Sequence, residues 1–341
     1  YEFVRLQTEI WTSADMTGPN GYLPTINGKT YTLDDYRNIE QYNWQDMIFQ
    51  DALQQSHNLS LTGGTAGNRY NASFSYFDQD GVVINSNYNK IQGRLGTNIR
   101  RNKLNINLAI NYSKTTQFGS SPSQSSYSGM NNLFYSVWGY RPVTQPSVPL
   151  STLLDNPTDE SVDRLNDYRF NPIMSLKNEY NKRTTEYNQF NGFIEREFIK
   201  GLKLKISGGY TIDGRRGEVF NNSKTRYGAT ISNDKVNATF WTSKRKTWLN
   251  ENNLTYQTNF NKKHFINAMV GLTMQESNYE YYSMKTIYIP NESLGMAGMS
   301  QGTPNNLVSS RSEWSMISYL GRFNYNYLSK YYATVSFRAD G

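Results

Sequence analysis

The sequence predicts an all-β fold: a transmembrane antiparallel β-barrel segment of about ten strands, with long extracellular loops and short periplasmic turns. Three observations carry this prediction. Apolar and polar residues alternate along several stretches, short and long connections between those stretches also alternate, and no run of about 18 apolar residues could form a membrane helix. The mean hydropathy of −0.72 fits such a barrel, because its polar inner face offsets its apolar outer face in any average.

The composition excludes several classes of site. The 341 residues include no Cys, which rules out a disulfide scaffold, thiol chemistry and Cys-type zinc sites. His57 and His264 are the only histidines, so a His-rich metal site is excluded as well. The formal net charge is +7. Its basic residues are spread over predicted turns and one strand face, so we expect no nucleic-acid partner.

The predicted strands place apolar side chains at every second position. In 104–113 the even positions hold Leu, Ile and Tyr, and most odd positions hold Asn. Segments 202–213 and 265–275 repeat this pattern, and in 90–99 the apolar Ile and Leu face away from basic and amide side chains. The other predicted strands are 58–64, 69–78, 185–198, 244–260, 315–327 and 331–339. Residues 1–15 have helical spacing instead and predict a short loop helix.

The polar faces of these strands supply candidates for the barrel interior. Polar positions that alternate with a lipid-facing apolar set point into the lumen of a membrane barrel. The lumen-facing candidates are Lys90, Arg94, Asn105, Asn107, Lys203 and Lys205.

The connections between the strands fall into two kinds in strict alternation. Short ones lie at 64–68, 100–103, 199–201, 261–264 and 328–330, and longer ones at 79–88, 117–184, 214–243 and 277–314. Bacterial outer-membrane barrels have this asymmetry, with tight periplasmic turns and long extracellular loops. A soluble propeller or lectin-like sandwich remains an alternative, as does a surface β-sandwich adhesin or other binding protein. A sandwich would bury the apolar strand face under a second sheet.

Several segments resemble one family of membrane proteins, and the resemblance covers nearly the whole chain. Tyr1–Gln7, Trp44–Ala52 and Tyr70–Val82 are similar to the SusC/RagA-like TonB-dependent transporters of Bacteroidetes. Further similar segments follow in the expected order: His57–Gly64, Tyr140–Pro146, Asn171–Pro172, Phe198–Lys203, Ser318–Tyr325 and Ser336–Gly341.

The resemblance implies a fold, a function and partners. Residues 1–341 would form part of the β-barrel domain of a TonB-dependent receptor of about 22 strands, with the plug domain and the C-terminal strands absent from this sequence. Such proteins sit in the bacterial outer membrane, in contact with its lipid, and import oligosaccharides, or in some cases peptides. A SusD-like surface lipoprotein covers the barrel, and the TonB–ExbB–ExbD complex supplies the energy.

Aromatic and arginine side chains in the predicted long loops are candidates for ligand binding. Flat aromatic faces with Arg nearby suit sugar rings, and the same set would suit a peptide. Packing within the loops, or against a lid protein, would explain each residue as well. The ligand-binding candidates are Trp138, Tyr140, Arg141, Tyr227, Trp241 and Trp314.

Neither a cofactor nor a catalytic centre is predicted. Asp78–Gly81 has the look of a calcium loop but lacks the further ligands, so a turn explains it better. The acidic residues Asp155, Asp159, Glu160, Asp163 and Asp167 could hold calcium, although a solvated loop face is favoured. An outer-membrane hydrolase is the remaining alternative. We expect no enzyme, because His57 and His264 fall at opposite ends of the predicted barrel and neither lies beside a nucleophile motif.

Overall fold

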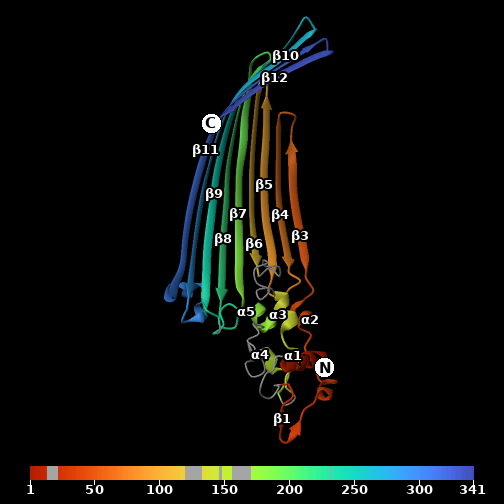
Figure 1. The fold of residues 1–341 in the computed structure, drawn as a ribbon. Coiled ribbons are helices and arrows are strands. Elements are labelled where there is room, and N and C mark those ends of the chain that lie inside the picture. Colours follow the sequence, from red (N-terminus) through yellow and green to blue (C-terminus); the bar gives the residue numbers. More distant parts are fainter. Residues whose placement is uncertain (14–21, 120–132, 146–147, 156–169, 231) are drawn as a thin grey trace.

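Ten long strands form one antiparallel sheet in the computed structural model, which describes residues 1–13, 22–119, 133–145, 148–155, 170–230 and 232–341 (Figure 1). The strands follow chain order from β3 to β12, and each pairs with its neighbours in the sequence. Their bounds are β3 Gln54–Gly64, β4 Asn68–Asp80, β5 Asn87–Arg101, β6 Leu104–Phe118, β7 Tyr180–Ile199, β8 Leu202–Asn221, β9 Asn237–Phe260, β10 His264–Ile287, β11 Thr303–Tyr327 and β12 Tyr331–Asp340. The predicted number of about ten strands and their antiparallel order are therefore confirmed.

The five short turns lie where the sequence predicts them, and their residues have the backbone angles that tight turns require. Asn102 and Asn261 adopt positive φ angles of 51° and 56°, which Asn tolerates better than most residues. Gly201 has a φ of +85°, and a Cβ there would lie 2.0 Å from the carbonyl oxygen of Gln257. A side chain at this position would therefore break the β7–β8 turn against the neighbouring strand.

The long connections are shorter than the sequence predicts, because most of the strands run further than their alternating patterns. They span 81–86, 119–179, 222–236 and 288–302. The expectation that Trp241 and Trp314 lie in loops is therefore wrong: they belong to β9 and β11. Near the long connections the alternation of apolar and polar residues fades, because both faces of the sheet meet water there.

The two faces of the sheet differ sharply in polarity. Leu95, which is 58% exposed, and Val270, which is 60% exposed, lie on the apolar face. One register row on this face crosses seven strands, through Leu61, Ala72, Leu95, Ile110, Phe190, Tyr210 and Trp248. In the part of the chain that the structure describes, the only other sheet is the two-residue hairpin β1 (Thr25–Ile26) and β2 (Lys29–Thr30). A sandwich partner that would bury this face is therefore not present among the described residues.

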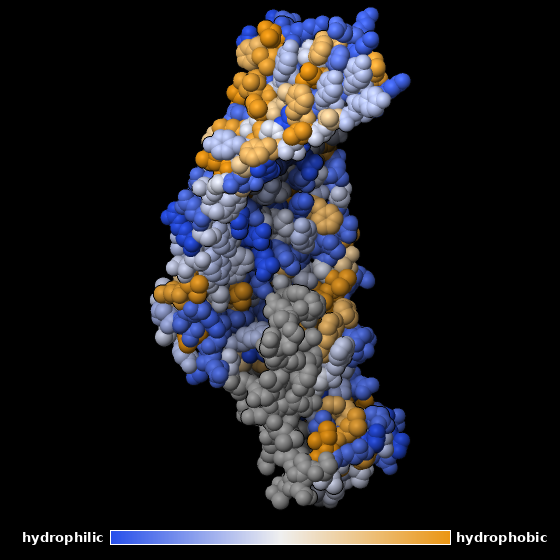
Figure 2. All heavy atoms as spheres, turned by 45° about the horizontal axis from the view of Figure 1, so that its top comes forward, coloured by the Kyte–Doolittle hydropathy of each residue, from blue (hydrophilic) through white to orange (hydrophobic). Residues whose placement is uncertain are grey.

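We call the apolar side of the sheet the outer face and the opposite side the inner face. Figure 2 shows hydrophilic side chains gathered over the middle of the visible surface, with hydrophobic ones more frequent toward the end that carries the short turns. The part of a strand that carries the apolar outer-face residues, such as Leu202–Ile212 on β8, is long enough to cross the roughly 25 Å apolar layer of an outer membrane when tilted. None of the described helices is long and apolar enough to cross a membrane.

A group of short helices, here called the helical cap, lies at the end of the sheet with the long connections (Figure 1). It combines the N-terminal segment with the connection between β6 and β7, although these are far apart in the sequence. Its helices are α1 Glu2–Ser13, η1 Leu33–Tyr36, α2 Trp44–Ile48, α3 Leu133–Gly139, α4 Thr152–Asp155 and α5 Pro172–Asn178. Two apolar clusters hold it together, one around Trp44, Ile48 and Leu153, and one around Val4 and Tyr36.

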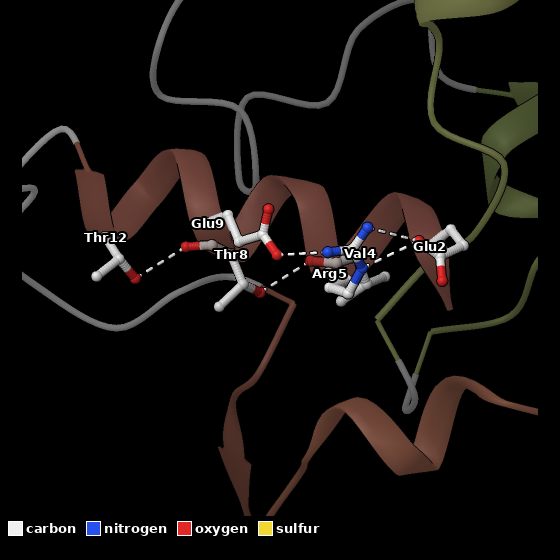
Figure 3. Close-up of polar contacts among 6 residues, drawn as sticks. All are labelled: Glu2, Val4, Arg5, Thr8, Glu9 and Thr12. Carbon is white, nitrogen blue, oxygen red and sulfur yellow. Dashed lines mark hydrogen bonds and ion pairs between the residues drawn. The ribbon is translucent and has the colours of Figure 1, made fainter.

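The first helix of the cap confirms the helical reading of the N-terminal residues. Val4 is buried, while Arg5 on the exposed side binds Glu2 one turn back and Glu9 one turn ahead (Figure 3). The hydroxyl groups of Thr8 and Thr12 donate to the backbone oxygens four residues before them, at 2.8 and 2.9 Å. Exposed ion pairs at this spacing add only a few tenths of a kcal/mol each, so the burial of Val4 does more to hold the helix in place.

Candidate functional site

The inner face of the sheet holds the side chains that the sequence predicts to face a lumen. Lys90, Arg94, Asn105, Asn107, Lys203 and Lys205 all project from it, opposite to the apolar row. Their neighbours are polar as well: Asn98 donates to the side chain of Asn105 at 3.1 Å, and Glu195 lies directly opposite Lys205. This face offers amide and charged groups over the width of the sheet.

Toward the long-connection end, the inner face carries a cluster of aromatic and arginine side chains. Arg183, Gly217 and Trp241 occupy one register row on β7, β8 and β9. The Arg183 guanidinium lies 5.6 Å from the centre of the Trp241 ring. The centres of the Trp241 and Tyr281 rings are 6.5 Å apart, and the ring planes are 31° apart. We call this cluster the arginine–aromatic wall. It comprises Arg183, Asp213, Arg215, Gly217, Trp241, Arg245, Tyr279 and Tyr281.

The position of the Trp241 indole depends on the glycine beside it. A Cβ on Gly217 would lie 2.1 Å from Trp241 Nε1 and 2.2 Å from its Cε2. The ring therefore lies across the bare backbone of β8, where any larger residue would displace it. Nothing in the local sequence marks Gly217 or Arg183, since only strand register shows that they flank Trp241.

On the side of that row nearer the short turns, the wall is dominated by positive charge. Arg215 binds Asp213 through two nitrogens, at 3.0 and 3.3 Å. Arg245 stands opposite Asp213 on the next strand, with its guanidinium 4.9 Å from the centre of the Tyr279 ring. The wall thus sets three guanidinium groups against one carboxylate, and its aromatic rings offer flat faces between them.

Trp314 extends this surface. It pairs with Ser277 on β10, is 45% exposed and lies on the inner face, two positions along β11 from the partner of Tyr279. The structure therefore brings Trp241 and Trp314, two of the sequence candidates, onto one face of the sheet, on β9 and β11 with β10 between them.

The other candidates lie in the cap or beside it. Trp138 is 70% exposed, stacks on Phe134 with the ring centres 5.2 Å apart, and donates through Nε1 to Gln45 at 3.0 Å. Tyr140 is only 4% exposed and packs edge-on against Trp44, so its ring offers no face to a ligand. Burial raises the pKa of Tyr140 to about 12. Arg141 is buried too, and its backbone oxygen accepts a hydrogen bond from Trp44. The prediction that Tyr140 and Arg141 contact a ligand is wrong, because both residues are buried in the core of the cap.

Tyr227 borders a cavity of about 180 Å³ between the cap and the long-connection ends of β7 and β8. Its backbone oxygen accepts hydrogen bonds from Asn237 and Ser232, and burial raises the pKa of its phenol. Tyr227 is thus separate from the arginine–aromatic wall.

The described residues show no group of three or more His, Asp or Glu that could hold a metal ion. Of the acidic loop residues, Asp155 ends α4, whereas Asp159, Glu160, Asp163 and Asp167 lie outside the described residues. His57 stacks on Tyr76, and His264 at the short-turn end contacts the Tyr325 hydroxyl at 2.7 Å. No histidine therefore lies near the wall.

An open-edged, strongly amphipathic sheet with short turns at one end and longer connections at the other defines an outer-membrane β-barrel segment. No protein-family model matches the chain. The TonB-dependent receptor P26 of Formosa agariphila is 28% identical over 309 residues, which cover 88% of this chain and 29% of that protein. The TonB-dependent receptor SusC of Bacteroides thetaiotaomicron is 22% identical over 325 residues, covering 88% of this chain and 30% of that protein. The chain thus spans less than a third of the length of these curated relatives.

Solved structures agree on the fold. A structure of the RagAB peptide importer in the "open-open" state matches 97% of this chain and 36% of its own chain, with a TM-score of 0.69 and 18% identity. A second RagAB structure matches 88% of this chain and 33% of its own, with a TM-score of 0.67 and 20% identity. The resemblance seen in the motifs is confirmed: the chain is a SusC-like TonB-dependent receptor segment. Outer-membrane location follows, and the relatives are receptors and transporters rather than enzymes.

Proposed function

We propose that the receptor to which this chain belongs imports oligosaccharides across the outer membrane, with this chain forming part of its barrel wall. The observation that carries the proposal is the arginine–aromatic wall on the inner face, near the end with the long connections. The C–H faces of sugar rings pack on indole and phenol rings, and sugar hydroxyl groups bind amide and charged side chains. Trp241, Tyr281 and Trp314 supply such rings next to a largely polar surface.

Two partners belong to this proposal. A SusD-like surface lipoprotein would cover the end of the barrel that carries the helical cap, and the TonB–ExbB–ExbD complex would power uptake from the opposite side. The similarity to SusC and to the RagAB structures supports both. The cap presents exposed side chains such as Trp138 to a body seated above it.

A second candidate is the import of peptides. The RagAB structures that share this fold are described as those of a peptide importer. The same rings and guanidinium groups would serve peptide side chains and a terminal carboxylate. The architecture suits both cargoes, so the cargo must be tested directly.

The test is growth of a strain that lacks the full-length receptor gene, on a panel of oligosaccharides and on a panel of peptides as sole carbon source. We expect loss of growth on one class of oligosaccharide and normal growth on peptides. Complementation with the intact gene should restore growth, and a Trp241→Ala variant should restore it only in part. Loss of growth on peptides alone would replace the first proposal by the second.

A further inference from the structure

The inner face of the sheet carries most of the chain's excess positive charge, as the strand register shows. On β4 to β7 this face holds Arg69, Lys90, Arg94, Arg100 and Arg183 against Glu195 and Glu197. On β8 to β12 it holds Lys203, Lys205, Arg215, Arg245, Lys285, Arg322 and Arg338 against Asp213, Glu251 and Asp340. Twelve cationic groups therefore face five carboxylates. On the outer face of the same strands, eight cationic groups face seven carboxylates, which is close to balance.

Two of the five inner carboxylates, Asp213 and Asp340, form ion pairs with Arg215 and Arg338. Glu195 and Glu197 stand opposite Lys205 and Lys203, and Asp340 binds Arg338 at 2.9 Å. The two Glu–Lys pairs lie across β7 and β8, and the pair of Asp340 with Arg338 lies along β12. Lys285 binds Asp234 of the connection between β8 and β9 at 2.6 Å. The rest of the inner face still carries more cations than carboxylates.

At the arginine–aromatic wall the imbalance is concentrated beside flat rings. Asp213 is shared between Arg215, which it binds, and Arg245, which it faces. No ion pair links Arg183 to a carboxylate among the described residues, and its guanidinium lies 5.6 Å from the centre of the Trp241 ring. A guanidinium held near an aromatic ring keeps its fork of N–H donors free for a planar anion.

We infer that the wall binds an anionic sugar, with the carboxylate or sulfate group on Arg183 and the sugar ring against Trp241. This inference rests on the proposed function and narrows its substrate class to charged oligosaccharides. The chemistry is complementary in two ways. Arg binds carboxylate and sulfate oxygens through paired hydrogen bonds, and the indole face accepts the C–H side of the ring that carries the anion. A neutral sugar would use only the second contact.

The test uses the full-length receptor, purified in detergent with any lipoprotein that accompanies it. Its probes are a panel of oligouronates and oligosaccharide sulfates, each paired with its uncharged form, the methyl ester or the desulfated sugar. We expect at least one charged probe to bind about tenfold or more tightly than its uncharged form, since hydrogen bonds to charged groups are the strong ones. The advantage should shrink as salt is raised, because ions screen it.

Variants connect the preference to the wall. Arg183→Gln should bring the affinity for the charged probe close to that of the uncharged form, and leave the uncharged form unaffected. Arg183→Lys should keep part of the preference, since it keeps the charge but loses the fork. Lys246→Gln is the matched control, because Lys246 is the exposed neighbour of Arg245 on β9 and points to the outer face. Normal abundance in the outer membrane shows that each variant folds.

The outcomes separate the two proposals. Equal binding of charged and uncharged sugars, or an equal effect of Arg183→Gln and Lys246→Gln, would overturn the anionic wall and leave oligosaccharide import standing. Binding of peptides with no binding of any sugar would overturn oligosaccharide import itself.

Discussion

The indole nitrogen of Trp44 donates a 2.9 Å hydrogen bond to the backbone oxygen of Arg141, across 97 positions of the chain. This contact joins α2 of the N-terminal segment to the end of α3 in the connection between β6 and β7. Nearby, the backbone nitrogen of Tyr42 donates to the oxygen of Pro142 at 2.9 Å. The helical cap is therefore one unit made from two distant parts of the sequence.

Trp44→Ala should open the cap while leaving the sheet intact. Trp44 is 3% exposed at the centre of the larger apolar cluster, and truncation of a buried Trp costs about 3–5 kcal/mol. Hydrogen–deuterium exchange should show faster exchange in residues 133–145 and 170–178, with no change in β7 to β10. Trp138→Ala, at an exposed Trp of the same cap, is the control, and we expect it to change exchange little. Equal exchange in both variants would contradict the packing described here.

Gly217→Val should disturb the arginine–aromatic wall through the ring of Trp241. The added side chain overlaps the indole, which must leave the surface of β8. We expect a changed tryptophan fluorescence spectrum and weaker binding of any oligosaccharide that the receptor takes. Gly208→Ala on the same strand is the control, because the nearest atom to its Cβ is 3.9 Å away. A normal spectrum and normal binding in Gly217→Val would show that the indole does not depend on this glycine.

Val270→Lys should reduce the amount of receptor in the outer membrane. Val270 lies in the apolar band of the outer face, where a Lys at the bilayer midplane costs about 2–4 kcal/mol. Thr273→Lys, on the inner face of the same strand, should be tolerated. Abundance in the membrane and heat-dependent mobility in electrophoresis measure both variants. A water-exposed sheet would tolerate the two equally, so equal abundance would exclude the lipid-facing assignment.

The cap should loosen at alkaline pH. Burial raises the pKa of Tyr140 to about 12, above the value of about 10 in an unfolded chain. The resulting stability is fully present below pH 10 and is lost as the pH rises from about 10 to about 12, because the opened form releases its phenol proton more readily. Exchange of residues 133–145 should therefore accelerate over that range. Tyr140→Phe should shift this acceleration to higher pH, and an unchanged profile would remove Tyr140 as its cause.

The strands could be predicted well because the membrane imposes a strict pattern on them. Alternation and turn spacing predict all ten, and β6 begins at the predicted residue, Leu104. The ends of the strands near the long connections could not be predicted in this way. Beyond the apolar band both faces meet water, so the stretch from Ser277 to Ile287 on β10 alternates in no simple manner.

The candidate site was predicted only in part, for a related reason. Trp241 and Trp314 were recognised as aromatic candidates, but their places in the sheet depend on pairing. Gly217 and Arg183 matter because they lie beside Trp241 in register, and nothing in their local sequence marks them. The burial of Tyr140 cannot be predicted from its own segment, because it depends on Trp44, a residue almost a hundred positions away.

The strands rise to unequal heights above the apolar band. Toward the long connections, β5 reaches only from Leu95 to Asn87, whereas β10 reaches from Val270 to Ile287. The helical cap lies beyond the ends of the shorter strands, whereas the 3-10 helix η3 (Glu292–Gln301) lies beyond the ends of the longer ones. A body resting on this rim would touch the several helices of the cap on one side and η3 alone on the other. The two sides of the rim are unlike, so the rim itself can fix the orientation in which such a body is seated.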